Sequence, residues 1–250
     1  MDTLKKGASL EPDPGLVGDE EHITKCIMQY YGSFKGLKVL GAGCGTGRIE
    51  AWLAAEGAKV VCLDHLVEAL QISRIHAHRM DCTEHFVVGD MQGMPFKDKT
   101  FDLIYSGGVL EHFEDPVKPL REYLMITKPG GLIVVSVPNL VGINSAFGIK
   151  PLTELGFRRR RTNEYIEQDY TAGKFRYAIN GSGFRCLDIC PTYFNTFDHF
   201  PFKHLRRILL FLGVYHNCCK FLDAFGAKFP GIAFGYSFMI AIAQKPETGN

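Results

Sequence analysis

Residues 38–47 read Lys38-Val39-Leu40-Gly41-Ala42-Gly43-Cys44-Gly45-Thr46-Gly47. The apolar run at the start predicts a short strand, and the alternate glycines predict a tight turn out of it. The next residues, 48–56, have a helical pattern that ends at Gly57, a residue type favoured at helix C-termini. A strand, a glycine-rich turn and a helix in this order begin a βαβ unit, so the stretch indicates a parallel sheet.

The same alternation of strands and helices continues along the chain. A helical pattern at 18–33 precedes the glycine turn. Tight-turn residues at 128–131 separate a helix from a following strand. Further helices are predicted at 66–79, 116–126 and 172–180, and further strands at 59–64, 84–88, 100–106, 132–137, 184–190 and 235–243. We therefore expect an α/β fold with a doubly wound, mostly parallel sheet.

The composition excludes several classes of protein. The chain has 250 residues, 46% of them apolar, and 28 basic against 27 acidic side chains, unlike a disordered, collagen-like or low-complexity chain. Residues 1–15 are polar without an apolar run, so we expect no secretory leader and a cytoplasmic protein. The eight cysteines are then expected to be free thiols. The longest uncharged stretch, 229–244, contains a proline and two glycines and is interpreted as a buried strand.

Charge is divided unequally along the chain. Residues 1–149 carry 14 basic and 19 acidic side chains, whereas residues 150–250 carry 14 basic and 8 acidic ones. Charge excess alone favours an ordinary solvated surface, and four adjacent arginines at 158–161 favour contact with something acidic. Aromatic residues do not alternate with basic ones as they do on nucleic-acid-binding surfaces, so we expect no nucleic-acid partner.

The glycine loop points to a nucleotide-like ligand, because such a turn lets a ligand approach the backbone and the helix N-terminus. The ligand could be a dinucleotide or S-adenosylmethionine. The dinucleotide fingerprint G-x-G-x-x-G does not match from Gly41, Gly43 or Gly45; the loop reads G-x-G-x-G-x-G. Asp64 ends the second predicted strand, where a carboxylate can accept both ribose hydroxyls of an adenosyl group.

Read together, five motifs resemble the class I S-adenosylmethionine-dependent methyltransferases, most closely the small-molecule branch that includes the quinone-biosynthesis methyltransferases. The resemblance is strong over 37–139 and weaker over 170–190 and 235–243. It rests, in chain order, on residues 39–47, 61–64, 89–96, 101–106 with 110–116, and 128–131. It implies a seven-stranded Rossmann-like sheet in the order 3-2-1-4-5-7-6, and S-adenosylmethionine as the cofactor.

The resemblance also implies roles for single residues. The glycines would lie against the methionine part and the ribose, Asp64 would bind the ribose hydroxyls, and Asp90 would accept from the adenine amino group. Ser106 and Gly107 would line the sulfonium end. The implied cofactor-binding residues are Gly41, Ala42, Gly43, Gly45, Asp64, His65, Asp90, Met91, Ser106 and Gly107.

Two positions depart from the pattern of the family. Members usually carry an acidic residue where Gly41 stands, which helps to hold the amino group of the cofactor, and often a serine where Leu66 stands. The missing acid affects the contacts at the methionine end, and the fold does not depend on it.

Two residues after the fourth predicted strand are candidates for catalysis. Methyl transfer mainly needs alignment of donor and acceptor, and a base only where the acceptor loses a proton. His112 is either such a base or a histidine that orders its loop, and Glu111 is either a site carboxylate or a first-turn residue favoured by the helix dipole. No metal is expected, because Cys186 and Cys190 lack zinc-site spacing and are interpreted as buried thiols.

Residues 191–230 have no strand pattern and are interpreted as a helical cap inserted before the last strand. Within them, 202–225 carry an apolar helical stripe with Lys203, Arg206 and Arg207 mostly off it. This segment is either a substrate cap over the sheet or a basic amphipathic helix in peripheral contact with a membrane, and the two are compatible.

We expect a single domain that transfers a methyl group from S-adenosylmethionine to a small apolar or anionic acceptor, such as a lipid-like or quinone-like molecule. The alternatives are a domain that binds the cofactor without turnover and a nicotinamide-dependent oxidoreductase. The expected parts are an N-terminal helical cover (1–36), a cofactor-binding core (37–139), the second half of the sheet (140–190), the cap (191–230) and the last strand with the tail (231–250). The N-terminal cover and the cap are expected to lie over the carboxyl ends of the strands.

Overall fold

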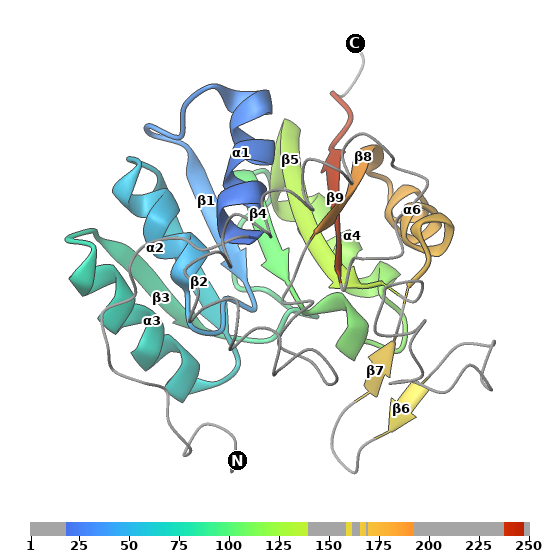
Figure 1. Ribbon diagram of the computed structural model, residues 1–250, viewed down its shortest axis with the longest axis horizontal. Coiled ribbons are helices and arrows are strands. Elements are labelled where there is room, and N and C mark those ends of the chain that lie inside the picture. Colours follow the sequence, from blue (N-terminus) through green and yellow to red (C-terminus); the bar gives the residue numbers. More distant parts are fainter. Residues whose placement is uncertain (1–18, 140–158, 162–165, 169, 193–237, 248–250) are drawn as a thin grey trace, which may run out of the picture.

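A sheet of seven strands forms the centre of the computed structural model, which describes residues 19–139, 159–161, 166–168, 170–192 and 238–247 (Figure 1). The strands lie in the order β3-β2-β1-β4-β5-β9-β8, which confirms the predicted order. All neighbours pair in parallel except β9, which is antiparallel to both β5 and β8. The strands are β1 (Lys38–Ala42), β2 (Lys59–Asp64), β3 (Glu84–Val88), β4 (Phe101–Gly107), β5 (Thr127–Pro138), β8 (Arg185–Thr192) and β9 (Phe238–Gln244).

Helices cover both faces of this sheet (Figure 1). On one face, α1 (Asp19–Tyr31), α2 (Arg48–Ala55) and α3 (Val67–Arg79) share a hydrophobic cluster with the sheet. On the other face, α4 (Val117–Ile126) and α6 (Ala172–Gly181) close a second cluster. A strand buried on both faces needs apolar residues throughout, and all residues of β5 from Gly131 to Pro138 are buried.

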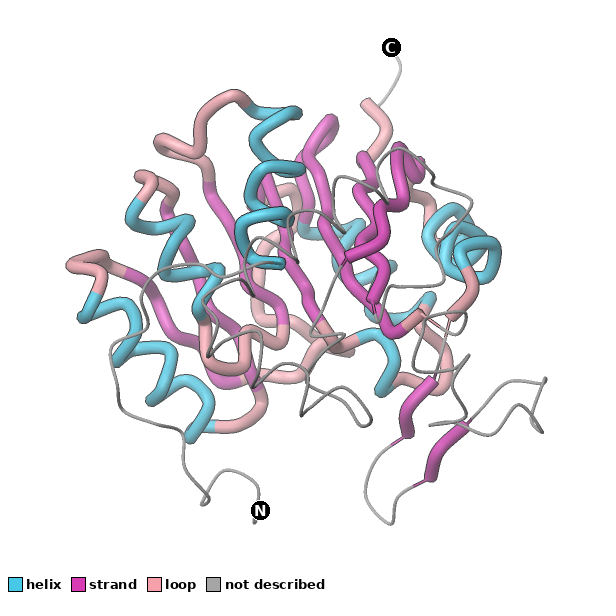
Figure 2. Tube along the Cα trace, in the orientation of Figure 1, coloured by secondary structure: helices cyan, strands magenta, loops and turns pink. Residues whose placement is uncertain are grey.

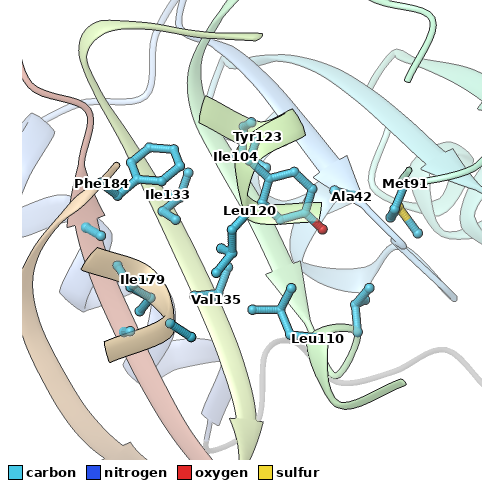
Figure 3. Close-up of a cluster of buried hydrophobic side chains, with 14 of the residues drawn as sticks. Ala42, Met91, Ile104, Leu110, Leu120, Tyr123, Ile133, Val135, Ile179 and Phe184 are labelled. Carbon is cyan, nitrogen blue, oxygen red and sulfur yellow. The ribbon is translucent and has the colours of Figure 1, made fainter. Parts of the chain in front are cut away.

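The second cluster packs against the central strands of the sheet. Figure 3 shows its labelled side chains extending across the view from Phe184 and Ile179 to Ala42 and Met91. Tyr123 of α4 is fully buried in the middle, and its hydroxyl lies 3.0 Å from Ser106 Oγ of β4. This bond satisfies a phenol that would otherwise be buried without a partner, so α4 is held to β4 at a defined position.

The described elements differ from the sequence predictions in several places. α1 packs on a face of the sheet, through Ile23 and Ile27, and does not cover the carboxyl ends of the strands, because its apolar side matches that face. β5 begins five residues earlier than predicted, since the predicted turn is a bulge in the strand. The hairpin of β6 (Arg159–Arg161) and β7 (Ile166–Gln168) was not predicted. The expected cap, 191–230, lies outside the described residues except at Pro191 and Thr192, which end β8.

Two expectations on cysteines and membranes can be compared with the described residues. Cys186 and Cys190 carry free thiols but are only half-buried, because β8 is the edge strand of the sheet. Within the described ranges, no helix is long and apolar enough to cross a membrane.

A buried polar cluster lies beneath α3. Cys62 of β2 donates to Glu84 Oε2 of β3 at 3.4 Å, and Ser73 Oγ of α3 donates to the Cys62 sulfur at 3.6 Å. Burial raises the pKa of Glu84 from 4.5 to about 7, against the opposing effect of its hydrogen bonds to Cys62 and Ser73. Glu84 is therefore a carboxyl group that the fold prefers to keep protonated.

We predict that Glu84 makes the protein less stable at alkaline than at acidic pH. Because the pKa of Glu84 is higher in the folded than in the unfolded chain, the free energy of unfolding falls as pH rises from about 5 to about 8. Glu84→Gln removes this contribution, about 2–3 kcal/mol, from the pH dependence. Urea unfolding at both pH values measures it, with the exposed Glu56→Gln as the control. Equal pH dependence in wild type and Glu84→Gln would refute the prediction.

Candidate functional site

Four loops meet at the carboxyl edge of the sheet, where β1 and β4 lie side by side and the chain winds away in opposite directions. They follow β1, β2, β3 and β4, and Figure 2 shows them in pink at one end of the sheet. A Cβ added to Gly43 in the first loop would lie 2.6 Å from Val109 in the fourth and 3.0 Å from Met91 in the third. Open α/β sheets bind ligands at such a switch point, so this edge is the candidate site.

The loop after β1 is built from glycines because its backbone is left-handed at three positions. Gly43, Gly45 and Gly47 have φ values of 70°, 53° and 67°, which side-chain-bearing residues rarely adopt. The amides of Gly43 and Cys44 both donate to the Leu63 carbonyl, at 2.8 and 3.1 Å. Gly47 is the N-cap residue of α2, and a Cβ there would lie 1.8 Å from Ser73 Oγ, so α2 and α3 approach closely at this point.

Asp64, the last residue of β2, organises the loops on either side of it. Its Oδ2 accepts from the Gly45 amide and its Oδ1 from the Leu66 amide, both at 2.9 Å. Asp64 is only 6% exposed, so these charge-assisted bonds form where water competes little. Each oxygen retains further acceptor capacity, because a carboxylate has about four lone-pair positions.

The other residues expected at the adenine end lie in the loops after β2 and β3. His65 is exposed, and its Nδ1 lies 3.4 Å from Asp64 Oδ1. Asp90 is exposed and accepts from the Gln92 amide at 2.9 Å, which shapes the loop after β3. Met91 is buried against Gly43 and Val109, so its side chain forms a wall of the first loop.

The residues after β4 form the other side of the candidate site. Ser106 is buried and its hydroxyl is bonded to Tyr123, so its backbone is what remains to line a ligand. Gly107 ends β4, and Gly108 then turns with a φ of 69°. This turn leads into the short 3-10 helix η1 (Leu110–His112), which contains both catalytic candidates.

Glu111 and His112 differ in their exposure. Glu111 is 4% exposed, and its Oε1 would lie 3.6 Å from a Cβ added at Gly108. Its charge adds to burial in raising the pKa values of the Tyr123 and Tyr170 hydroxyls. His112 is exposed at the end of η1, and its amide donates to the Val109 carbonyl. Of the two, His112 can reach a molecule in solvent, and Glu111 places negative charge inside the site.

Sequence reasoning overlooked Glu50, which was assigned only to a helix. The structure brings its side chain against Gly41: a Cβ added at Gly41 would lie 2.4 Å from both Cγ and Oε1 of Glu50. Gly41 and Ala42 themselves are buried at the end of β1. The signal that could have identified Glu50 is a buried carboxylate directly beside a glycine. This signal can be recognised only when the placement of α2 over β1 is known.

Comparisons with known proteins agree with this architecture. Residues 40–135 match a family model described as a methyltransferase domain. A demethylmenaquinone methyltransferase of Renibacterium salmoninarum is 31% identical over 120 residues, 48% of this chain and 49% of that protein. A ubiquinone biosynthesis O-methyltransferase of Coxiella burnetii is 26% identical over 179 residues, 66% of this chain and 73% of that protein. The chain thus spans about half of the first relative's length.

A solved structure extends the likeness beyond the family match. A Burkholderia thailandensis 1,6-didemethyltoxoflavin-N1-methyltransferase, with bound 1,6-didemethyltoxoflavin and S-adenosylhomocysteine, superposes with a TM-score of 0.61. The two are 15% identical, and the match covers 98% of this chain and 82% of the other. At this identity the likeness concerns the fold.

We predict that Gly47→Ala destabilises the protein far more than Gly45→Ala. Both positions have positive φ, so both variants carry backbone strain of about 1 kcal/mol. Only Gly47 would place its Cβ against Ser73, whereas no heavy atom lies within 4 Å at Gly45. We expect an additional loss of about 1–3 kcal/mol for Gly47→Ala, measured by urea unfolding. In a Ser73→Gly background the Ser73 side chain is absent, so there Gly47→Ala should cost no more stability than Gly45→Ala does in wild type. Equal losses of stability in Gly47→Ala and Gly45→Ala would contradict the prediction.

Proposed function

We propose that this chain, whose residues 40–135 match a family model described as a methyltransferase domain, transfers a methyl group from S-adenosylmethionine to a small organic acceptor. The observation that carries the proposal is Asp64, buried at the end of β2 and hydrogen-bonded to the loops after β1 and β2. A carboxylate fixed beside a glycine loop offers a ribose two acceptors without any rearrangement. The lack of G-x-G-x-x-G argues against the dinucleotide alternative.

The residues around Asp64 fit an adenosyl group in chemistry as well as in shape. Leu66 and Val88 are exposed apolar side chains, 37% and 56%, at the ends of β2 and β3. Such surfaces suit the face of a purine, and the exposed carboxylate of Asp90 can accept from its amino group. Gly45, with open space beside its Cα, lets a ligand approach the loop backbone. We assign the cofactor contacts to Gly41, Ala42, Gly43, Gly45, Asp64, His65, Asp90, Met91, Ser106 and Gly107.

The bound cofactor would supply a methyl group already activated by a sulfonium, so the protein chiefly has to align the acceptor and exclude water. Alignment of two reactants can lower a barrier by about 7–11 kcal/mol. The rigid walls for this task are the packed loops around Gly43, Met91 and Val109. His112 would take a proton from an acceptor that loses one, and Glu111 would hold the acceptor or a protonated His112 by its charge.

For the acceptor we propose an apolar body, quinone-like or lipid-like, with an acidic end. The two relatives are named for demethylmenaquinone and ubiquinone biosynthesis, which supports this class. The residues expected to enclose it, 191–230 with the basic amphipathic segment at 202–225, lie almost wholly outside the described part of the chain, so the cap and its membrane contact are part of the proposal. The location that fits such an enzyme is the cytoplasm.

Binding of S-adenosylhomocysteine tests the cofactor assignment. We expect wild type to bind it and to show no binding of NADH in calorimetry. Asp64→Ala should weaken the binding by about 2–3 kcal/mol, because two charge-assisted hydrogen bonds to the ribose are lost. The exposed Asp98→Ala is the matched control and should bind as wild type does. NADH binding without adenosyl binding, or unchanged affinity in a folded Asp64→Ala variant, would overturn the assignment.

Turnover on a panel of quinols, phenols and fatty acids tests the catalytic residues. If the acceptor loses a proton, His112→Gln should lower kcat by about 100-fold or more and leave the affinity for S-adenosylhomocysteine unchanged. Glu111→Gln should also lower kcat, since its charge acts within the same site. His85→Gln, an exposed histidine of β3, is the control. Full turnover by both His112→Gln and Glu111→Gln would show that alignment alone suffices.

A further inference from the structure

α2 brings a carboxylate to the place where β1 lacks one. The family that this chain resembles usually has an acidic residue at the position of Gly41, beside the amino group of the cofactor. Here a Cβ at position 41 would lie 2.4 Å from Glu50 Oε1 and 2.8 Å from its Cδ. The carboxylate of Glu50 therefore occupies the space into which an acidic side chain at position 41 would project.

The glycine at position 41 serves to make room, not to shape the backbone. Gly41 lies within β1 and is not among the glycines with positive φ, so its conformation does not require a glycine. Any side chain there would overlap Glu50, so an acid at 41 and Glu50 in its present position exclude each other. Compared with the family pattern, the acidic residue is therefore exchanged between two positions: it is absent at Gly41 on the strand and present at Glu50 on the helix packed against that strand.

Glu50 is a buried carboxylate and not a surface charge. It is 2% exposed, although glutamate is rarely buried to this extent in proteins. It lies in the first turn of α2, where the helix dipole favours negative charge. The start of α2 follows the glycine loop directly, so this charge stands at the same carboxyl edge of β1 as the candidate site.

We propose that Glu50 supplies the carboxylate that binds the α-ammonium of the cofactor's methionine moiety, in place of an acid at position 41. The inference rests on the proposed function and assigns one further residue to that site. The contact between the carboxylate and the ammonium is charge-assisted, and the adenosine part of the ligand does not make it.

Two ligands separate this role from general damage to the site. S-adenosylhomocysteine has the α-ammonium, whereas 5′-methylthioadenosine has the same adenosine and sulfur without the amino acid. Calorimetry on Glu50→Gln should show binding of S-adenosylhomocysteine weakened by about ten- to a hundredfold. Binding of 5′-methylthioadenosine should remain within about twofold of wild type, because that ligand makes no contact with Glu50. Glu56→Gln, an exposed acid at the C-terminal end of α2, is the control and should leave both affinities unchanged.

The exchange itself provides the second variant. Glu50→Ala clears the space beside position 41, and Gly41→Asp then restores an acid on the strand. We expect Gly41→Asp/Glu50→Ala to bind S-adenosylhomocysteine at least tenfold more tightly than Glu50→Ala does, whereas Gly41→Asp alone should lower the melting temperature through overlap with Glu50. If Glu50→Gln fails to fold, this double variant tests whether a carboxylate at this place binds the ammonium.

The outcomes separate this inference from the proposed function. Failure of wild type to bind S-adenosylhomocysteine refutes both. Wild-type binding of both ligands, together with equal weakening of both in Glu50→Gln, leaves the methyltransferase proposal standing and shows that Glu50 only supports the loop. Unchanged affinities in a folded Glu50→Gln variant, or a folded double variant that binds no better than Glu50→Ala, likewise refute the role of Glu50 alone.

Discussion

The bonds from the Gly45 and Leu66 amides to the Asp64 carboxylate are the constraint on which the site depends. They join the loop after β1 to the start of α3, at 2.9 Å each, through a group that is almost wholly buried. Glycines with left-handed φ values are permissive and do not by themselves hold a shape. The hydrogen bonds to Asp64 hold the glycine loop in one conformation, in which it can bind a ligand.

The rest of the fold serves to keep Asp64 and its neighbours in register. β2 pairs with β1 and β3 over five residues each, which fixes the end of β2 between the first and third loops. Near the fourth loop, the Tyr123 hydroxyl is hydrogen-bonded to Ser106, and Tyr170 donates to the Leu110 carbonyl. These two buried tyrosines therefore support η1. Preorganisation of this kind reduces the entropy that a ligand must lose on binding.

Sequence patterns predict the first half of this fold well because its signals are local. The strand at 84–88 matches β3, and the helices at 48–56 and 66–79 match α2 and α3 within a residue. The bulge at 128–131 was predicted as a turn, since Pro129 and the two glycines signal either, and only pairing with β4 decides between them. Placement of Glu111 and His112 on η1, and burial of only one of them, depends on how η1 packs and not on their spacing.

Residue contacts across elements were beyond the reach of sequence patterns. Asp64 was predicted from its place at the end of a strand, but its bonds to Gly45 and Leu66 follow from the three-dimensional turn. Glu50 was missed because its position in a helix carries no sign of what lies opposite. The exchange with Gly41 is visible only when α2 is set on β1.

Amide hydrogen exchange with and without saturating S-adenosylhomocysteine tests the central claim most directly, because it reports on each loop separately. The account predicts that the ligand slows exchange at the amides of residues 42–48, 64–67 and 90–92, and leaves the paired amides of β8 and β9 as they were. Unchanged exchange in all three loops, or slowing confined to residues away from the carboxyl edge of β1, β2 and β3, would contradict it.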